Sequence, residues 1–194
     1  MKPEKNRLSG RQIKADILAL LGGGNFDQAL VTIRRLPARQ AVNPLFSFLY
    51  YTDAQIRWRA ITAMGVVVAQ MADADPEAAR VVMRRLMWNL NDESGGMGWG
   101  SPEAMGEIMA RSPLLADEYA HILLSYLRED MNYLEHEALQ RGLLWGVARL
   151  ADARPALVRP AAADLRPHLD SPDAAKRRLA AAALTAIDPG AVRP

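Results

Sequence analysis

The side chains best suited to chemistry in this 194-residue chain are two glutamates and a short His–Glu–Arg motif. Glu103 and Glu107 are four residues apart, so both carboxylates lie on one face of a predicted helix. His136 precedes Glu137, and Arg141 follows four residues later. Histidine with carboxylates can bind iron, manganese or zinc. The other interpretation is a solvated helix face with an ordinary i,i+4 pair between Glu137 and Arg141, and a single His–Glu pair favours it.

Most other catalytic chemistry is disfavoured by composition and spacing. The chain has no cysteine, which excludes disulfides, thiolate metal sites and cysteine nucleophiles. Its three histidines, His121, His136 and His168, are far apart in the sequence, and no serine has the strand-to-helix context of a hydrolase nucleophile. We therefore predict a non-catalytic protein with no metal and no cofactor, and an enzyme stays the alternative.

Tryptophan and arginine form a second group of candidate contact residues. Arg57, Trp58 and Arg59 are consecutive, and Trp99 occupies the position in a later segment that Trp58 holds in its own. Aromatic and arginine side chains dominate binding surfaces, which is one interpretation. The other is that tryptophans at helical spacing are core residues.

The segment from Asn91 to Ser101 departs most from the rest of the chain. It carries four glycines, the acids Asp92 and Glu93, and Trp99. One interpretation is a recognition loop with Trp99 as its anchor; the other is a long turn whose tryptophan is buried. A phosphate-binding loop is disfavoured, because no lysine follows the glycines.

These residues are positioned by a repeat. Three segments end in a bulky residue and a glycine, at Gly65, Gly106 and Gly146, with steps of 41 and 40 residues. A fourth, looser copy places Thr185 another 39 residues on. A period near 40 with helical spacing inside each unit is typical of a helical solenoid. Such folds usually present a surface for binding.

Proline, glycine and aspartate residues mark the predicted starts and ends of the individual helices. Two helices, ending before Pro37, form an N-terminal cap over residues 1–37. The following segments are predicted helices: 38–51, 56–71, 76–91, 102–111, 113–128, 133–151, 155–169 and 174–187. The second helix of each pair would build the concave face, at about 56–71, 101–111, 133–150 and 174–187. The leucine before each turn is predicted to be buried: Leu49, Leu90, Leu127 and Leu169.

The pattern of helix, leucine, aspartate-containing turn and second helix resembles HEAT repeats, and "LDSPDAAKRRLAAAALTAI" at 169–187 is similar to those of the PBS-lyase type. The resemblance covers residues 38–190. It implies an all-α, right-handed α-α superhelix with about four helical hairpins plus the cap, in a single domain over 1–194. It also implies that the turn aspartate caps the second helix and the early arginine packs against it, as Asp53 with Arg57, and Asp170 or Asp173 with Arg177.

Proteins with this repeat suggest several alternative functions. "LEHEALQR" resembles a motif of deoxyhypusine hydroxylase, a di-iron enzyme, but that family needs several His–Glu pairs and this chain has one. HEAT-like alkylpurine DNA glycosylases use tryptophan, aspartate and arginine on the concave face, and bilin lyases bind a small molecule there. We predict instead a non-catalytic protein-binding or scaffolding protein. The candidate contact residues are Arg57, Trp58, Arg59, Asp92, Glu93, Trp99, Glu103, Glu107, His136 and Arg141.

The distribution of charge suggests the kind of partner. Residues 1–60 carry a net charge of +6, residues 61–140 a net −8 and residues 141–194 a net +4. An acidic centre interrupts the basic track that DNA binding needs, so nucleic acid is disfavoured and a partner protein with a basic segment is predicted. No apolar run is long enough to span a bilayer and no signal peptide is evident, so we expect no membrane association and a cytoplasmic location. The oligomeric state stays open.

Overall fold

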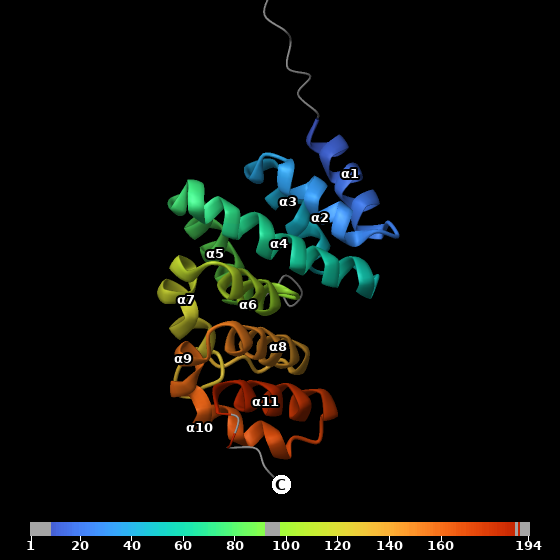
Figure 1. Ribbon diagram of the computed structural model, residues 1–194. Helices are drawn as coiled ribbons and strands as arrows, with labels where there is room; N and C mark the ends of the chain where they lie inside the picture. Colours follow the sequence, from blue (N-terminus) through green and yellow to red (C-terminus); the bar gives the residue numbers. More distant parts are fainter. Residues whose placement is uncertain (1–8, 92–97, 189, 191–194) are drawn as a thin grey trace, which may run out of the picture.

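The computed structural model describes residues 9–91, 98–188 and 190, and within them the ordered elements are all helical. Figure 1 shows these helices stacked along one axis, with α1 and α11 at opposite ends. In chain order they are α1 (Gly10–Gly22), α2 (Phe26–Arg35), α3 (Ala38–Phe48), α4 (Ala54–Ala74), α5 (Pro76–Asn91), α6 (Ser101–Arg111), α7 (Pro113–Ser125), α8 (Glu137–Ala153), α9 (Pro155–Val158), η1 (Arg159–Ala161), α10 (Ala162–Leu165), η2 (Arg166–Asp170) and α11 (Ala174–Ile187).

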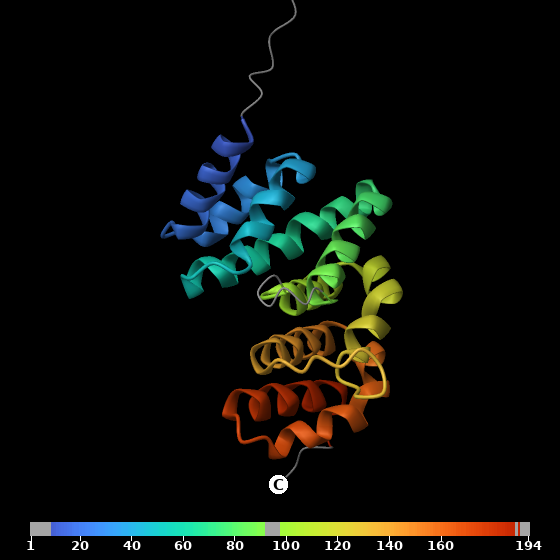
Figure 2. The ribbon, with the colours of Figure 1, turned by 180° about the vertical axis from the view of Figure 1, so that it is seen from behind.

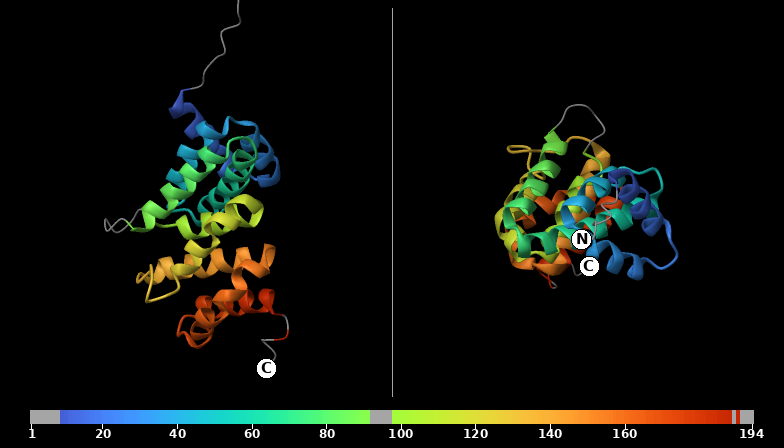
Figure 3. Two further views of the ribbon diagram at one scale, coloured as in Figure 1. Left: turned by 90° about the vertical axis from the view of Figure 1, so that its left-hand side faces the viewer. Right: turned by 90° about the horizontal axis from the view of Figure 1, so that it is seen from above.

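The stack consists of helical hairpins beneath a cap. The second helices α4, α6, α8 and α11 are successive neighbours, and each packs on the next (Figure 1). The first helices of these hairpins are α3, α5, α7 and the segment from α9 to η2. The view from behind and the left-hand view of Figure 3 show the same order of layers (Figures 2 and 3). Helices α1 and α2 cap the stack against α3 and α4. The prediction of an all-α solenoid with a terminal cap is confirmed.

Short polar side chains start the helices, as the sequence predicts. The side chains of Ser9, Asn25, Asp53, Ser112 and Asp173 each accept a hydrogen bond from a backbone N–H in the first turn of the following helix. These bonds satisfy donors that have no partner inside the helix. The starts of both cap helices and of three repeat helices, α4, α7 and α11, are thereby fixed.

The repeating glycines lie where neighbouring second helices touch. A Cβ atom on Gly106 of α6 would overlap the backbone of Gly146 in α8, and one on Gly146 would overlap the carbonyl oxygen of Pro102. The missing side chains therefore let the two helices approach backbone to backbone. This contact accounts for the glycine in the second and third of the repeated segments.

Three of the four predicted turn leucines are core residues. Leu49, Leu90 and Leu127 are buried. Leu169 is only half-buried, and Leu165 is fully buried instead, so that part of the prediction is wrong. The cause is local, because Leu169 lies in the 3-10 helix η2 and not in a regular α-helix, which changes the direction of its side chain.

Two predicted helices differ from the structure. Residues 155–169 do not form one helix but the short elements α9, η1, α10 and η2. Proline inside a helix lacks an N–H donor and clashes with the preceding turn, and both 3-10 segments contain one, at Pro160 and Pro167. The helix expected from residue 133 begins at Glu137, because the backbone of Leu134 instead bonds to Tyr126 and to the side chain of Gln140.

Candidate functional site

A groove crosses the four second helices near their N-terminal ends, and we call it the Trp groove. Its volume is about 640 Å³. Residues from α4, from α6 and the turn before it, from α8 and from α11 contribute to it, so it spans every repeat of the stack. The lining consists of Arg57, Trp58, Trp99, Gly100, Glu103, Ala138, Leu139, Arg141, Gly142, Trp145, Ala175, Arg178, Leu179 and Ala182.

Three tryptophans give the groove aromatic surface. The rings of Trp58 and Trp145 are 4.9 Å apart between centroids with an interplanar angle of 45°, although they come from α4 and α8. Trp99 is 41% exposed, and its ring lies 5.7 Å from that of His136. Of the two interpretations of Trp99, the structure supports the accessible one over burial in the core.

The groove follows the repeat register. Trp58, Trp99, Leu139 and Arg178 each stand seven residues before the repeat position at 65, 106, 146 and 185, and all four line the groove. Sequence reasoning matched the two tryptophans but omitted Leu139, Arg178 and the nearby Trp145. Extending the same offset to the third and fourth repeats would have found the first two. Trp145 has no such signal, because its repeat partners Met64 and Met105 are fully buried.

Glu103 places an unsatisfied carboxylate in the groove. Its Oε2 atom is buried and has no hydrogen-bond partner. The side chain fits against α8 because position 142 is glycine, where a Cβ atom would lie 2.6 Å from the carboxylate oxygens. Burial raises the pKa of Glu103 to about 7, against the opposing effects of its own backbone N–H and the charge of Arg57. A buried oxygen without a partner is free to accept a hydrogen bond from a ligand or from a water molecule.

Three arginines line the same groove as Glu103, and they differ in how far they are paired within the fold. Arg57 donates through Nη1 to the carbonyl oxygen of Tyr51 at 3.2 Å, and Arg141 pairs with Asp173. Arg178 makes neither a hydrogen bond nor an ion pair within the part of the chain that the structure describes. The groove therefore holds guanidinium groups that remain wholly or partly available to a ligand.

Two other predicted contact residues, Arg59 and Glu107, have intramolecular roles. Arg59 donates through Nη1 to the carbonyl oxygens of Leu21 and Gly23, at 2.7 and 2.6 Å, and so holds the end of α1. Glu107 is buried and bridges Arg111 and Arg149, at 2.5 and 2.6 Å. These two residues do not line the Trp groove, because their charged groups are committed to the fold.

His136 is the N-cap of α8. Its Nδ1 atom accepts a hydrogen bond from the backbone N–H of Ala138 at 3.2 Å. It reaches the groove only through its ring contact with Trp99. Asp92 and Glu93 lie outside the described residues. The groove thus brings together five of the predicted residues: Arg57, Trp58, Trp99, Glu103 and Arg141.

The described residues offer neither a metal cluster nor a membrane-spanning helix. Within the ranges 9–91 and 98–188, no group of three or more histidine, aspartate or glutamate side chains is placed to hold a metal ion. Among the same residues, no helix has the length and apolar character needed to cross a membrane. The prediction that the protein uses no metal and no cofactor stays a prediction.

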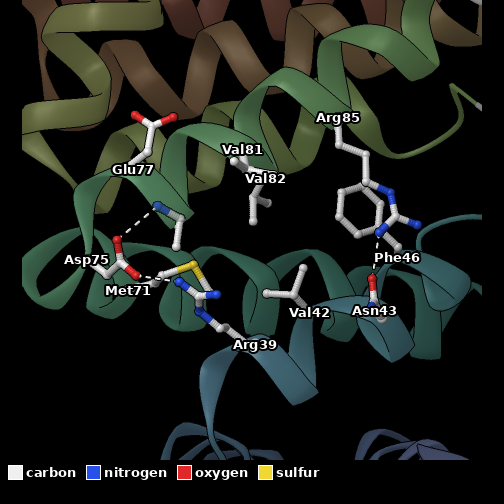
Figure 4. A pocket seen from close by; sticks show the side chains of 11 residues that line it. Arg39, Val42, Asn43, Phe46, Met71, Asp75, Glu77, Val81, Val82 and Arg85 are labelled. Carbon is white, nitrogen blue, oxygen red and sulfur yellow. Dashed lines mark hydrogen bonds and ion pairs between the residues drawn. The ribbon is translucent and has the colours of Figure 1, made fainter.

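A second cavity of about 380 Å³ lies between α3, the end of α4 and α5, as shown in Figure 4. Its polar side chains form hydrogen bonds or ion pairs within the fold. Arg39 pairs with Asp75 at 2.7 Å, and Arg85 donates to Asn43 at 2.6 Å while its guanidinium lies 3.9 Å from the ring centroid of Phe46 (Figure 4). No lining residue is shared with the Trp groove. Of the two cavities, the Trp groove is the one that offers an unsatisfied polar atom.

Comparison with known proteins gives the fold and no named activity. No family model matches the chain. An uncharacterized protein of Archaeoglobus fulgidus is 29% identical over 108 residues, which is 56% of this chain and 52% of that protein. The chain thus matches about half the length of this relative.

Several solved structures that share this fold are designed or engineered proteins. A designed armadillo repeat protein has a TM-score of 0.51 and 18% identity, with 93% of this chain and 87% of that chain covered. Another, in complex with the peptide (KR)4, has a TM-score of 0.52 and 15% identity over the same shares. An engineered protein matches with a TM-score of 0.51 and 17% identity over 90% of this chain and 78% of that one. The chain therefore has the fold of an armadillo- or HEAT-like helical solenoid.

Proposed function

We propose that this protein is a non-catalytic binding or scaffolding protein that holds an extended segment of a partner protein in the Trp groove. The observation that carries the proposal is the composition of that groove. Three tryptophans, partly available arginines and the unsatisfied Oε2 atom of Glu103 lie together across four stacked helices. Tryptophan and arginine are the residue types that dominate protein interfaces.

The shape of the groove favours an extended occupant. It receives residues from four successive repeats, so a ligand that fills it contacts α4, α6, α8 and α11 in turn. An extended polypeptide presents alternating side chains and free backbone N–H groups along its length. A backbone N–H is a suitable donor for Glu103. The designed armadillo protein in complex with (KR)4 supports this mode, because a solenoid of the same fold there holds a peptide.

Nucleic acid is the strongest rival, since arginine and tryptophan can also bind a single strand by charge and stacking. Two acids count against it. Glu103 lies in the groove itself, and Asp173 offsets the charge of Arg141 at its margin. A nucleic-acid strand carries a phosphate at every nucleotide and would meet these carboxylates along its path, whereas a peptide can place its charged side chains apart from them. A metal-dependent or bilin-binding activity has no comparable observation in its favour.

The proposal is tested by selecting a random peptide library on the protein and on two variants. Trp58→Ala combined with Trp145→Ala removes the stacked pair, while Trp88→Ala removes the 73% exposed tryptophan of α5, which lies outside the groove. We expect peptides that bind the protein and its Trp88 variant but not the double variant. Peptides that bind all three equally would contradict the proposal. Circular dichroism of each variant checks that the helices are retained.

A further inference from the structure

We propose that the segment bound in the Trp groove is acidic, with carboxylates that pair with Arg57 and Arg178 on either side of an apolar side chain that packs on Trp58 and Trp145. This inference rests on the proposed function and specifies the chemistry of the partner. It differs from the basic segment that the sequence predicts.

The first argument is the charge of the groove lining. Its charged residues are three arginines and one glutamate: Arg57, Arg141, Arg178 and Glu103. Asp173 balances Arg141, so with Glu103 ionised the local sum is +1, and with Glu103 protonated it is +2. The pKa of Glu103 near 7 keeps part of the population protonated at neutral pH. The electrostatic complement of this surface is an anionic ligand.

The second argument is the position of the acids that make residues 61–140 negative. Glu77 pairs with Arg84 at 2.5 Å, and Glu118 accepts two hydrogen bonds from Arg80, at 2.8 and 2.6 Å. Glu107 is buried between two arginines. These three glutamates are committed within the fold, and none of them lines the groove. Among the described residues of this stretch, Glu103 is the one acid in the groove lining, so the negative average does not describe the Trp groove.

The third argument is the geometry of charge around the aromatic pair. Arg57 and Arg178 come from α4 and α11, the first and last helices that line the groove. The rings of Trp58 and Trp145, 4.9 Å apart, and Leu179 provide apolar surface within the same groove. Guanidinium groups bind carboxylates in a bidentate manner, which also fixes register. A ligand segment with an apolar side chain between two acidic ones would contact both the aromatic surface and the arginines of the groove.

The test uses calorimetric titration of the protein with short peptides of one pattern. The probes alternate leucine with aspartate, with asparagine or with lysine, and single-stranded oligothymidylate is the fourth ligand. We expect the aspartate peptide to bind about tenfold more tightly than the asparagine peptide. Arg178→Gln should reduce that affinity about threefold to tenfold, while Arg159→Gln, which alters an exposed arginine outside the groove, should not. Glu103→Gln, which removes the negative charge of the lining and keeps an acceptor oxygen, should increase the affinity for the aspartate peptide.

Each other outcome overturns a defined part of the account. If the lysine or asparagine peptide binds as tightly as the aspartate peptide, or if the aspartate peptide does not bind, the acidic partner is wrong. In that case the groove function stands as long as library peptides still require Trp58 and Trp145. If library peptides bind without these tryptophans, the proposed function itself is wrong. Tighter binding of oligothymidylate than of any peptide, with loss in Arg178→Gln, would assign the groove to nucleic acid and overturn both.

Discussion

At the scale of single residues, the groove depends on side chains whose partners are far apart in the sequence. Glu103 could be recognised as a helical acid beside Glu107, but nothing in the spacing shows that one carboxylate lacks a partner and the other bridges two arginines. That difference depends on Gly142 and Arg149, which belong to another repeat. Residue types could therefore be predicted, while their burial and pairing required the fold.

The pKa of Glu103 gives a prediction for stability. Its folded-state value of about 7 lies above the ordinary 4.5, so the native state binds the extra proton between these limits. The contribution of Glu103 to stability is present below about pH 4.5 and is lost as the pH rises through 7, by on the order of 1–3 kcal/mol. Glu103→Gln should make the free energy of unfolding less dependent on pH in this range. Urea unfolding at pH values from about 5 to roughly 8 measures the effect.

His168 affects the stability of the protein over the same pH range, but in the opposite direction. Burial and the charge of Lys176 lower the pKa of His168, so stability from this residue is lost as the pH falls. His168→Gln is the matched control, because it should steepen the decline that Glu103 causes. An unchanged pH profile in Glu103→Gln would show that this carboxylate is ionised and solvated in the native protein.

At the scale of elements, the repeat period and the capping residues predicted most helix bounds. The start of α5 at Pro76 and the cap of α4 by Asp53 follow from local chemistry. The broken segment between Pro155 and Asp170 did not, because two prolines and tertiary packing outweighed a plausible helical pattern. The repeated glycine was visible as a period, but its cause, a backbone contact between α6 and α8, depends on the stacking of repeats.

The contact between α6 and α8 leads to a prediction for Gly106. Gly106→Ala places a methyl group against the backbone of Gly146, where no flexible side chain can move aside. We expect a loss of about 1–3 kcal/mol in unfolding free energy and a lower melting temperature. Gly22→Ala in α1 is the control, since its Cβ would meet no atom within 4 Å, and it should be neutral or stabilising. Equal stability of the two variants would contradict the close approach.

The turn leucines give a second prediction at this scale. Leu127→Ala should destabilise the protein by roughly 2–5 kcal/mol, because the side chain is buried in the core. Leu169→Ala should cost clearly less, since this leucine is half-buried in η2. Thermal denaturation of both variants measures the difference. If Leu169→Ala proves the more damaging, the local geometry of the last repeat is wrong.

At the scale of the whole molecule, the solenoid was predictable and its binding surface only in part. A period near 40 residues indicates the stack, and the register then aligns Trp58 with Trp99. Net charge along the chain does not give the charge of the Trp groove, because each helix divides its charges between faces and ion pairs. The acids of α5, α6 and α7 illustrate this, as Glu77, Glu107 and Glu118 are all paired.

The central claim, that the Trp groove holds a partner segment, can be tested in one spectrum. The four indole N–H signals of the ¹⁵N-labelled protein report on Trp58, Trp88, Trp99 and Trp145, of which only Trp88 lies outside the groove. On addition of a library-selected peptide, the account predicts that the signals of Trp58, Trp99 and Trp145 shift while that of Trp88 stays in place. A shift confined to Trp88, or no shift at saturation, would contradict it.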